Sequence, residues 1–429
     1  MKKLTILITL WLVYTIPAQA YLDPGTGSMM FSIIVALIAT VIYSAKSFVF
    51  KIKFYINKFF TKKIIKKKDM QIVFYNEGEQ YSNTFYPILK ELKNRNIDFH
   101  YLYSEKNDSI VKRIENIDAQ YIDNGNKAFY YLNTLEADIC IMTTPGLDVL
   151  QIKRSKGVKH YCHISHSAAG CAGYEVFGID YFDSILTTNV YDKNFIVELE
   201  RIRNLPPKEI HFVGNPYLDI LSEKLINIQI KKTNKTIILL SPTWGKTGLL
   251  SKYGKTLILE LLKNPQFHII IRPHPQSIRY EKTILNNLKS QFADKDNIEW
   301  DYEKDSLKSM YRADLMISDF SGIIFDYIFL FQKPVISIPT SITLKGKDYI
   351  DMNTPLWSIE FFYKNTIVLP EKDIDKISNI VITGLKEKRL RDKEIHQKYN
   401  PYANHASDMA ANAIESILNK LNRDENHVK

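Results

Sequence analysis

Short apolar runs alternate with longer amphipathic stretches along most of the chain, from residue 70 onward. Runs of four to eight apolar residues bounded by turn formers are typical of buried strands, and amphipathic stretches of ten or more residues are typical of helices. Helices are predicted over 82–93, 190–203 and 406–422, the last with Ser407 or Asp408 as its N-cap. The predicted strands are residues 71–75, 98–103, 137–144, 158–164, 184–188 and 210–213, followed by 236–242, 267–273, 297–300, 313–318 and 333–338.

Strands that alternate with helices in this way favour an α/β fold with parallel sheets and helices on both faces. A polar stretch at 229–235 separates the two series of strands. We therefore expect two similar Rossmann-like, doubly wound domains, over residues 70–230 and 235–422.

The pattern differs at the N-terminus. Residues 1–20 have Lys2 and Lys3, an apolar core and a small-residue Ala-Gln-Ala end, as a signal sequence does. A second apolar run over 29–49 is long enough to cross a bilayer. A Lys-rich segment over 50–68 follows it, and by the positive-inside rule this flank and the rest of the chain would be cytosolic. The first segment is either cleaved or retained as a second span, and a peripheral amphipathic anchor is the alternative.

Charge supports a membrane partner rather than a nucleic acid. The formal net charge is +10, but residues 1–68 hold 11 Lys and only one acidic residue, Asp23. The rest of the chain has 46 basic and 46 acidic residues. The excess from Lys46 to Lys68 is therefore suited to an anionic membrane surface, and no nucleic-acid partner is expected. Three cysteines are too few for a disulfide framework and fit a reducing compartment.

The residues best suited to chemistry follow predicted strands directly. Ligands of doubly wound sheets bind outside the carboxyl ends of the strands, so such turns from two facing domains would line one cleft. Gly, Pro, Asp and Ser are also ordinary turn formers, so it is the agreement of several turns that favours a ligand site. The turns are residues 144–146, 163–167, 214–216, 242–245, 272–275 and 318–319, and Asn215, Thr243 and Trp244 are expected to line the cleft.

The stretch MISDFSGIIFDY, residues 316–327, joins a predicted strand to an apolar helix. A helix start exposes unpaired N–H groups and a partial positive charge, and Ser318 and Ser321 add hydroxyls there. These groups predict a site for a phosphate or diphosphate, although simple N-capping by Ser318, Asp319 or Ser321 would explain them too. Asp326 would be costly to bury alone, so we expect it to accept from ligand hydroxyls or to pair with a cation.

The RPHP segment holds Arg272 and His274 between prolines that restrict the backbone at a strand end. Arginine binds phosphate oxygens well, and histidine can donate to them or move a proton.

Two other motifs lack the required spacing. GKT at 245–247 lacks the Gly that a phosphate-binding loop needs at 240, where Leu240 stands. HYCHISH at 160–166 does not have the spacing of a paired Cys/His zinc site, so no metal and no cofactor are expected.

Together, RPHP and the later SDFSGIIFDYIFLFQKPVI resemble the CDP-glycerol glycerophosphotransferase family, the teichoic-acid primases and polymerases. GNPYLD at 214–219 and SPTW at 241–244 lie where that family has similar segments. The resemblance extends over roughly residues 160–422 and implies a GT-B fold with the active site between two domains. It also implies transfer of a polyol phosphate from a CDP-activated donor to an acceptor hydroxyl, with release of CMP.

The resemblance also implies roles for individual residues. His166 matches a catalytic histidine of the N-terminal domain, and His274 matches the histidine of the family's R-x-H-P segment. By this match His166 is the general base, and Arg272, His274 and the 318–321 turn stabilise the diphosphate. The residues matching the family's phosphate-binding stretch are Ser318, Asp319, Ser321 and Asp326.

One departure concerns the first site, where the family often has His-Gly and this chain has His166-Ser167. Glycerol is the expected polyol, and ribitol is an alternative. A membrane anchor suits a lipid-linked or glycan acceptor. Two other functions remain open: a GT-B glycosyltransferase that uses a nucleotide sugar for capsule or surface polysaccharide, and a non-catalytic membrane-anchored component of an export complex.

Overall fold

The computed structural model describes residues 35, 37, 38, 40, 70–229, 233–303, 305–340, 347–352, 355–386 and 393–428. The chain divides into two compact units, Met1–Lys68 and Asp69–Lys429. The segments 1–20 and 50–68, and nearly all of 29–49, lie outside the described residues. No helix among the residues that the structure describes has the length and apolar character of a bilayer span.

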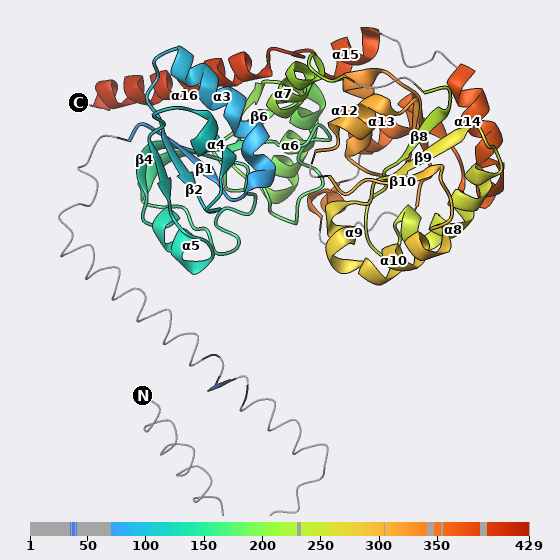
Figure 1. The fold of residues 1–429 in the computed structure, drawn as a ribbon. Coiled ribbons are helices and arrows are strands. Elements are labelled where there is room, and N and C mark those ends of the chain that lie inside the picture. The colour runs from blue at the N-terminus through green and yellow to red at the C-terminus, as the bar shows by residue number, and fades with distance from the viewer. Residues whose placement is uncertain are drawn as a thin grey trace, which may run out of the picture. The chain divides into compact units, whose positions relative to one another are not determined.

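Two parallel sheets form the framework of the second unit (Figure 1). Within the described residues the first sheet has the strand order β3-β2-β1-β4-β5-β6-β7. Its strands are β1 (Ile72–Asn76), β2 (His100–Tyr103), β3 (Ala119–Tyr121), β4 (Glu136–Met142), β5 (Gly157–Ile164), β6 (Ser184–Thr187) and β7 (Glu209–Phe212). The helices of this half are α3 (Ser82–Asn94), α4 (Ser109–Arg113), α5 (Asn126–Leu132), α6 (Val190–Arg203) and α7 (Pro216–Leu225), with the 3₁₀ turn η1 (Glu79–Tyr81).

The second sheet has the order β10-β9-β8-β11-β12-β13 in the described part of the chain. Its strands are β8 (Thr236–Leu240), β9 (Phe267–Ile271), β10 (Ile298–Trp300), β11 (Leu315–Ser318), β12 (Val335–Ser337) and β13 (Ile367–Val368). The later helices are α8 (Leu249–Leu262), α9 (Pro275–Tyr280), α10 (Lys282–Gln291), α11 (Leu307–Arg312), α12 (Ile323–Phe331), α13 (Trp357–Asn365), α14 (Ile377–Lys386), α15 (Lys393–Tyr399) and α16 (Ala406–Val428), with the 3₁₀ turns η2 (Asp348–Asp351) and η3 (Glu371–Lys376).

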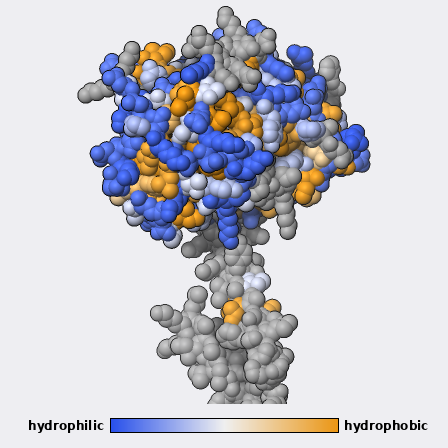
Figure 2. Space-filling view, turned by 90° about the vertical axis from the view of Figure 1, so that its right-hand side faces the viewer, coloured by the Kyte–Doolittle hydropathy of each residue, from blue (hydrophilic) through white to orange (hydrophobic). Residues whose placement is uncertain are grey.

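Strand composition explains why both sheets are buried on both faces. The central strands β8, β9 and β11 are almost continuous runs of Ile, Leu and Met, as strands covered on both faces must be. Apolar side chains gather on the two faces of each sheet, and the outer face of the second half is mostly hydrophilic, with apolar residues in separate groups (Figure 2). The expected α/β fold with parallel sheets is therefore confirmed.

The C-terminal helix does not stay with the second sheet, where the expected domain 235–422 had placed it. Ala410 and Ile414 of α16 pack in the same core cluster as Phe74 and Phe85 of the first half. Figure 1 shows α16 lying beside α3. Its apolar stripe covers the first sheet because strands β1 and β4 leave an apolar face there.

A second connection between the halves runs through residues 347–352 and 355–357. The Asp348 carboxylate, with no exposed surface, accepts the backbone N–H groups of Phe177 (2.8 Å) and Gly178 (3.0 Å) from the first half. It also pairs with Arg203 of α6 at 2.8 Å. Farther along, the Trp357 indole N–H donates to Asp192 at 3.1 Å. We call the described residues 347–352 and 355–357 the strap, because they fasten the second half to the first.

Candidate functional site

The polar turns expected to form a site do lie at carboxyl ends of strands. In the second sheet the strand order reverses between β8 and β11, so the loop after β8 and the turn after β11 are neighbours there. In the first half, the loop after β5 carries His166. Ala168 of this loop packs in one apolar cluster with Ile324 and Phe325 of α12. The His166 loop and α12 therefore belong to one apolar cluster that spans both halves.

His166 is half-buried between aromatic rings. Its imidazole lies 4.8 Å from the Tyr81 ring and 5.9 Å from the Tyr174 ring, centroid to centroid. Its Nδ1 is 3.4 Å from the Tyr174 hydroxyl. Burial lowers the pKa of His166 to about 4, so the imidazole is neutral at neutral pH, and a neutral imidazole is what a general base requires.

His274 is fixed as the N-cap of α9. Its Nδ1 accepts the Gln276 backbone N–H at 3.1 Å. Because Nδ1 is the acceptor, the proton of the neutral ring is on Nε2, which can donate to an oxygen anion. Burial lowers the pKa of His274, although Glu281 opposes this change.

The His274 ring also belongs to an aromatic group. It stacks with Trp244 at 6.4 Å, and Trp244 in turn lies 6.1 Å from the Tyr280 ring. Trp244 is 45% exposed, so one face of this group is open to solvent or ligand. Trp244 therefore lies beside His274, and its place in a ligand cleft stays a prediction.

Arg272 makes internal hydrogen bonds at the end of β9. Its guanidinium donates to the Asp301 carboxylate at 2.6 Å and to the Glu303 carbonyl at 2.8 Å, and the Arg272–Asp301 pair is buried. These bonds join the ends of β9 and β10. Arg272 thus stabilises the framework under His274 through a buried ion pair.

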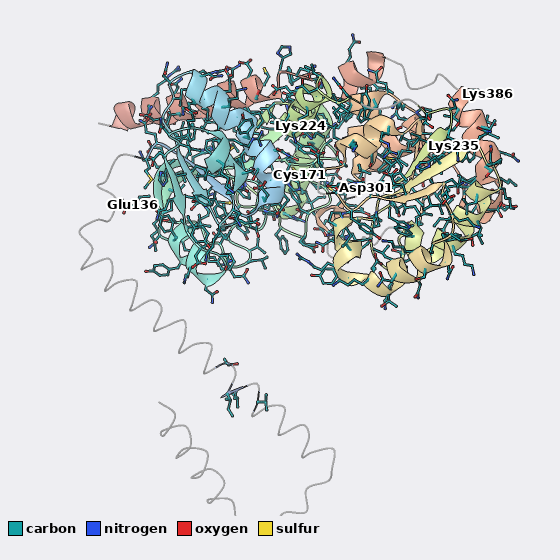
Figure 3. All side chains as sticks on the ribbon, in the orientation of Figure 1. Glu136, Cys171, Lys224, Lys235, Asp301 and Lys386 are labelled. Atoms are coloured by element: carbon teal, nitrogen blue, oxygen red, sulfur yellow. The ribbon has the colours of Figure 1, made fainter. Side chains whose placement is uncertain are left out.

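Figure 3 labels Cys171, in the loop that carries His166, and Asp301, the partner of Arg272. Both lie toward the middle of the molecule, in the first and second half respectively.

Asp319 also positions backbone rather than ligand. Its two carboxylate oxygens accept the backbone N–H groups of Thr243 (2.7 Å) and Leu249 (3.0 Å). These bonds fix both ends of the loop after β8. In the structure the Asp319 carboxylate therefore bonds to backbone, and Thr243 is held through its backbone N–H.

The two serines of the 318–321 turn are not equivalent. The Ser318 hydroxyl, with no exposed surface, donates to the Ser241 carbonyl at 2.7 Å. The Ser321 hydroxyl has no hydrogen-bond partner among the described residues, and it stands at the start of α12. Of the two, Ser321 is the one available to a phosphate oxygen.

Asp326 lies in the first turn of α12 and has no hydrogen-bond or ion-pair partner in the described part of the chain. Burial raises its pKa to about 7. Burial first, and then the Asp326 carboxylate, raises the pKa of the nearby Tyr217 hydroxyl. The expected pairing of Asp326 with a cation is therefore not found among the described residues.

Asn215 is the N-cap of α7. Its side-chain oxygen accepts the Tyr217 backbone N–H at 3.0 Å, and Pro216 occupies the first helical position. Its Nδ2 group is buried without a partner among the described residues. Asn215 thus has a structural role as the N-cap of α7, and its place in the cleft stays a prediction.

Tyr81 and Tyr174 were not predicted from the sequence. Tyr174 stands in a Gly-containing loop with no strand-end position to draw attention to it. Only the tertiary structure brings these rings to His166.

Comparison with known proteins gives two kinds of similarity. A family model for CDP-Glycerol:Poly(glycerophosphate) glycerophosphotransferase matches residues 57–343. No curated protein sequence matches the chain.

Among solved structures, the wall teichoic acid polymerase TagF, as a variant soaked with CDPG, has a TM-score of 0.53 at 16% identity, covering 88% of this chain and 98% of that chain. A putative UDP-N-acetylglucosamine 2-epimerase from Listeria monocytogenes has a TM-score of 0.55 at 12% identity, covering 81% and 96%. The UDP-GlcNAc 2-epimerase from Neisseria meningitidis bound to UDP-GlcNAc has a TM-score of 0.53 at 15% identity. The match covers 82% of this chain and 100% of that chain. At these identities the similarity is one of fold, and it supports a GT-B-like arrangement.

The family model provides more than fold, since it matches more than half of the 429 residues. Its match includes the His166 loop, the RPHP segment and the turn at the start of α12. The chain therefore belongs to the CDP-glycerol:poly(glycerophosphate) glycerophosphotransferase family, whose members are transferases.

Proposed function

We propose that the protein transfers glycerol phosphate from CDP-glycerol to a hydroxyl of a lipid-linked or glycan acceptor, with release of CMP. The observation that carries this proposal is that the His166 loop and α12 share one apolar cluster across the two halves. This arrangement supports a site that takes its general base from one half and its phosphate-binding groups from the other. Family membership supports the CDP-glycerol type of donor.

The acceptor side is assigned to His166. Its neutral ring takes the proton of the acceptor hydroxyl, and the oxygen attacks the β-phosphorus of the donor. The new P–O bond forms as the bond from the β-phosphorus to the bridging oxygen breaks, and CMP leaves with that oxygen. A bound diphosphate would raise the pKa of His166 from about 4, because a nearby anion stabilises the imidazolium.

The donor side is assigned to His274, Ser321 and the first turn of α12. The Nε2–H of His274 and the Ser321 hydroxyl donate to the diphosphate oxygens. The helix start adds its partial positive charge. Catalysis in this arrangement rests on positioning and on electrostatic stabilisation of the leaving CMP.

The place of action is proposed to be the cytosolic face of the cell membrane. The apolar run over 29–49 would anchor the protein, and the Lys residues from 46 to 68 would contact anionic lipid. A lipid-linked acceptor in the same membrane would then reach the site without diffusing through the cytosol.

The test is nucleotide release, CMP from a CDP-linked donor or UDP from UDP-GlcNAc, by the full-length protein purified with its N-terminal segments in detergent. CDP-glycerol, CDP-ribitol and UDP-GlcNAc are supplied separately with a lipid-linked acceptor. We expect CMP from CDP-glycerol above the other donors. Turnover of UDP-GlcNAc alone would instead favour a glycosyltransferase, and no turnover of any donor would contradict the proposal.

Two variants separate the two sides of the site. His166→Ala should lower turnover by about 10²–10⁴-fold and leave donor affinity unchanged, as expected for a lost general base. His274→Asn keeps an N-cap for α9 but removes the Nε2–H donor. It should therefore reduce both turnover and the affinity for CDP-glycerol measured by calorimetry. Full activity of folded His166→Ala would refute its assignment.

A further inference from the structure

One hydroxyl joins two histidines beside the site. The Tyr174 hydroxyl lies 3.1 Å from Nε2 of His163 and 3.4 Å from Nδ1 of His166. His163 is the penultimate residue of β5, and its ring has no exposed surface. A tyrosine hydroxyl has a single proton, so it donates to one of these nitrogens and accepts from the other.

His163 is a neutral partner in this chain of hydrogen bonds. Its ring packs edge-on against Tyr174 (5.3 Å) and lies 5.0 Å from the Phe182 ring. Burial lowers the pKa of His163 to about 3, with a smaller contribution from His166, so it carries one proton at neutral pH. Its Nδ1 is buried and has no partner among the described residues.

The Tyr174 hydroxyl can donate its proton to either histidine, and the choice decides which ring nitrogen of His166 carries a proton. If Tyr174 donates to His166, then Nδ1 is the acceptor and the proton of His166 is on Nε2. If Tyr174 donates to His163, then His166 holds its proton on Nδ1 and its Nε2 presents a lone pair. Only the second direction lets Nε2 act as a base.

We propose, on the basis of the proposed glycerophosphotransferase function, that Tyr174 is a positioning residue for His166. Its oxygen accepts the Nδ1–H of His166, and its proton goes to Nε2 of His163. The lone pair on Nε2 of His166 is then left for the acceptor hydroxyl. Tyr174 and His163 thus do for His166 what a buried carboxylate does for the histidine of a Ser-His-Asp triad, except that no charge is present.

The Tyr174 hydroxyl lies nearer to Nε2 of His163 than to Nδ1 of His166. The arrangement leaves the Nδ1–H of His163 as a buried donor with no partner among the described residues. An unsatisfied group of this kind lowers stability, and such groups occur at sites under functional constraint.

The strap holds Tyr174 in place. The Asp348 backbone N–H donates to the Tyr174 carbonyl at 2.9 Å, and the Asp348 carboxylate accepts from Phe177 and Gly178 just beyond it. The hydroxyl that sets the proton on His166 is therefore positioned from the second half of the molecule.

Ser165 provides a matched control. It lies beside the Tyr174 hydroxyl, and its own proton goes to the Ser167 carbonyl at 3.3 Å. If Ser165 were the true acceptor of the Tyr174 proton, Ser165→Ala would change the tautomer of His166. We expect no change.

The experiment determines which ring nitrogen of His166 carries the proton. Full-length protein with ¹⁵N-labelled histidine is studied in detergent by nitrogen–proton correlation NMR, and the His166 signals are assigned from their loss in His166→Gln. We expect wild type and Ser165→Ala to carry the His166 proton on Nδ1. Tyr174→Phe removes the acceptor of that proton, and His163→Phe removes the acceptor of the tyrosine proton. Both should shift the His166 proton to Nε2.

Turnover and stability complete the test. Both variants should lower kcat at least about tenfold, with donor affinity unchanged. His163→Phe keeps the aromatic packing and removes the unsatisfied donor, so its melting temperature should not fall. A proton on Nε2 of His166 in the wild type, or an unchanged tautomer in Tyr174→Phe, would overturn the inference. Failure of the proposed function is recognised separately, as absence of CMP release by the wild type.

Discussion

Ser318 and Ser321 are close in sequence and carry the same hydroxyl, but the structure uses them differently. Ser318 bonds to the Ser241 carbonyl and ties β11 to the loop after β8. Ser321 has no hydrogen-bond partner among the described residues. One serine belongs to the framework, and the other is left for a ligand.

Substitution should separate these roles. Ser321→Ala should weaken binding of CDP-glycerol by about 2 kcal/mol, the scale of one hydrogen bond to a charged group, without loss of stability. Ser318→Ala leaves a buried carbonyl unsatisfied and should cost about 1–3 kcal/mol of unfolding free energy. Calorimetry and denaturant unfolding measure the two effects. Unchanged affinity in Ser321→Ala would show that Ser321 only caps α12.

Asp326 should make stability depend on pH. Its pKa is raised from the ordinary 3.8 to about 7, so between these values the folded state binds more protons than the unfolded state. Stability therefore falls as pH rises from about 4 to about 7. A shift of this size corresponds to about 4 kcal/mol, and we expect about 2 kcal/mol because the side chain is partly exposed.

Denaturant unfolding of wild type and Asp326→Asn at pH 5 and pH 8 isolates this contribution. The variant should gain stability relative to wild type on going to pH 8. Other buried carboxyl groups, such as Asp192, titrate alike in both proteins and cancel in the difference. Parallel pH profiles would mean that Asp326 has a partner in solution.

At the level of elements, the loop after β8 and the turn after β11 form one unit. The Asp319 carboxylate holds the loop at Thr243 and Leu249. Glu281 holds it between these points, since its carboxylate accepts the Gly245 N–H at 3.1 Å. The loop carries Trp244, which stacks on His274, so these bonds also order the donor side of the site.

Loss of the Asp319 carboxylate should lower both the free energy of unfolding and the affinity for CDP-glycerol. Asp319→Ala leaves two backbone N–H groups unpaired and should cost about 2–3 kcal/mol of unfolding free energy. It should also weaken CDP-glycerol binding. Asp314→Ala is a control at the opposite end of β11, where Asp314 accepts the Ile237 N–H at 2.8 Å. Equal donor affinity in both variants would contradict the assigned role of Asp319.

Element prediction succeeded where burial leaves a strong pattern. Every strand that was predicted appears, and most of them, such as β8, β9 and β11, are buried apolar runs. The half-buried edge strands β7 and β10 were also predicted, whereas the edge strands β3 and β13, with three and two residues, were missed. The helix α16 was predicted as a helix, but its partner was not, because an apolar stripe does not specify which sheet it covers.

For the candidate site, the sequence likewise indicated which residues follow strands but not which groups they contact. Strand-end position singled out His166, His274 and Ser321. It could not distinguish a ligand contact from an internal bond, so Arg272 and Asp319 were expected at the phosphate. Their real partners, Asp301 and the backbone of the loop after β8, lie tens of residues away in the sequence.

At the level of the whole molecule, the halves are joined by more than the chain between them. The strap and α16 both return from the second half to the first. Helix α7 adds a third link, because Leu218 and Leu221 pack with residues of α12. The two halves that contribute the candidate site residues are therefore joined by contacts of the strap, α16 and α7.

The cytosolic placement of this body can be tested by labelling. Cys140, Cys162 and Cys171 are all buried, so they give little background with a membrane-impermeant maleimide. A cysteine introduced at the exposed Lys106 should react only after the cells are permeabilised. Reaction in intact cells would place the body outside and contradict the proposed membrane topology.

The return of α16 has a consequence for the order in which the protein folds during synthesis. The first sheet leaves the ribosome well before Ala410, Ile414 and Ile417, the residues that complete its core. Until they emerge, the apolar surface around Phe85 and Leu89 of α3 lacks part of its cover. The nascent chain should therefore depend on chaperones during the whole translation of the second half, and its first half should become resistant to protease only when the last helix has been made.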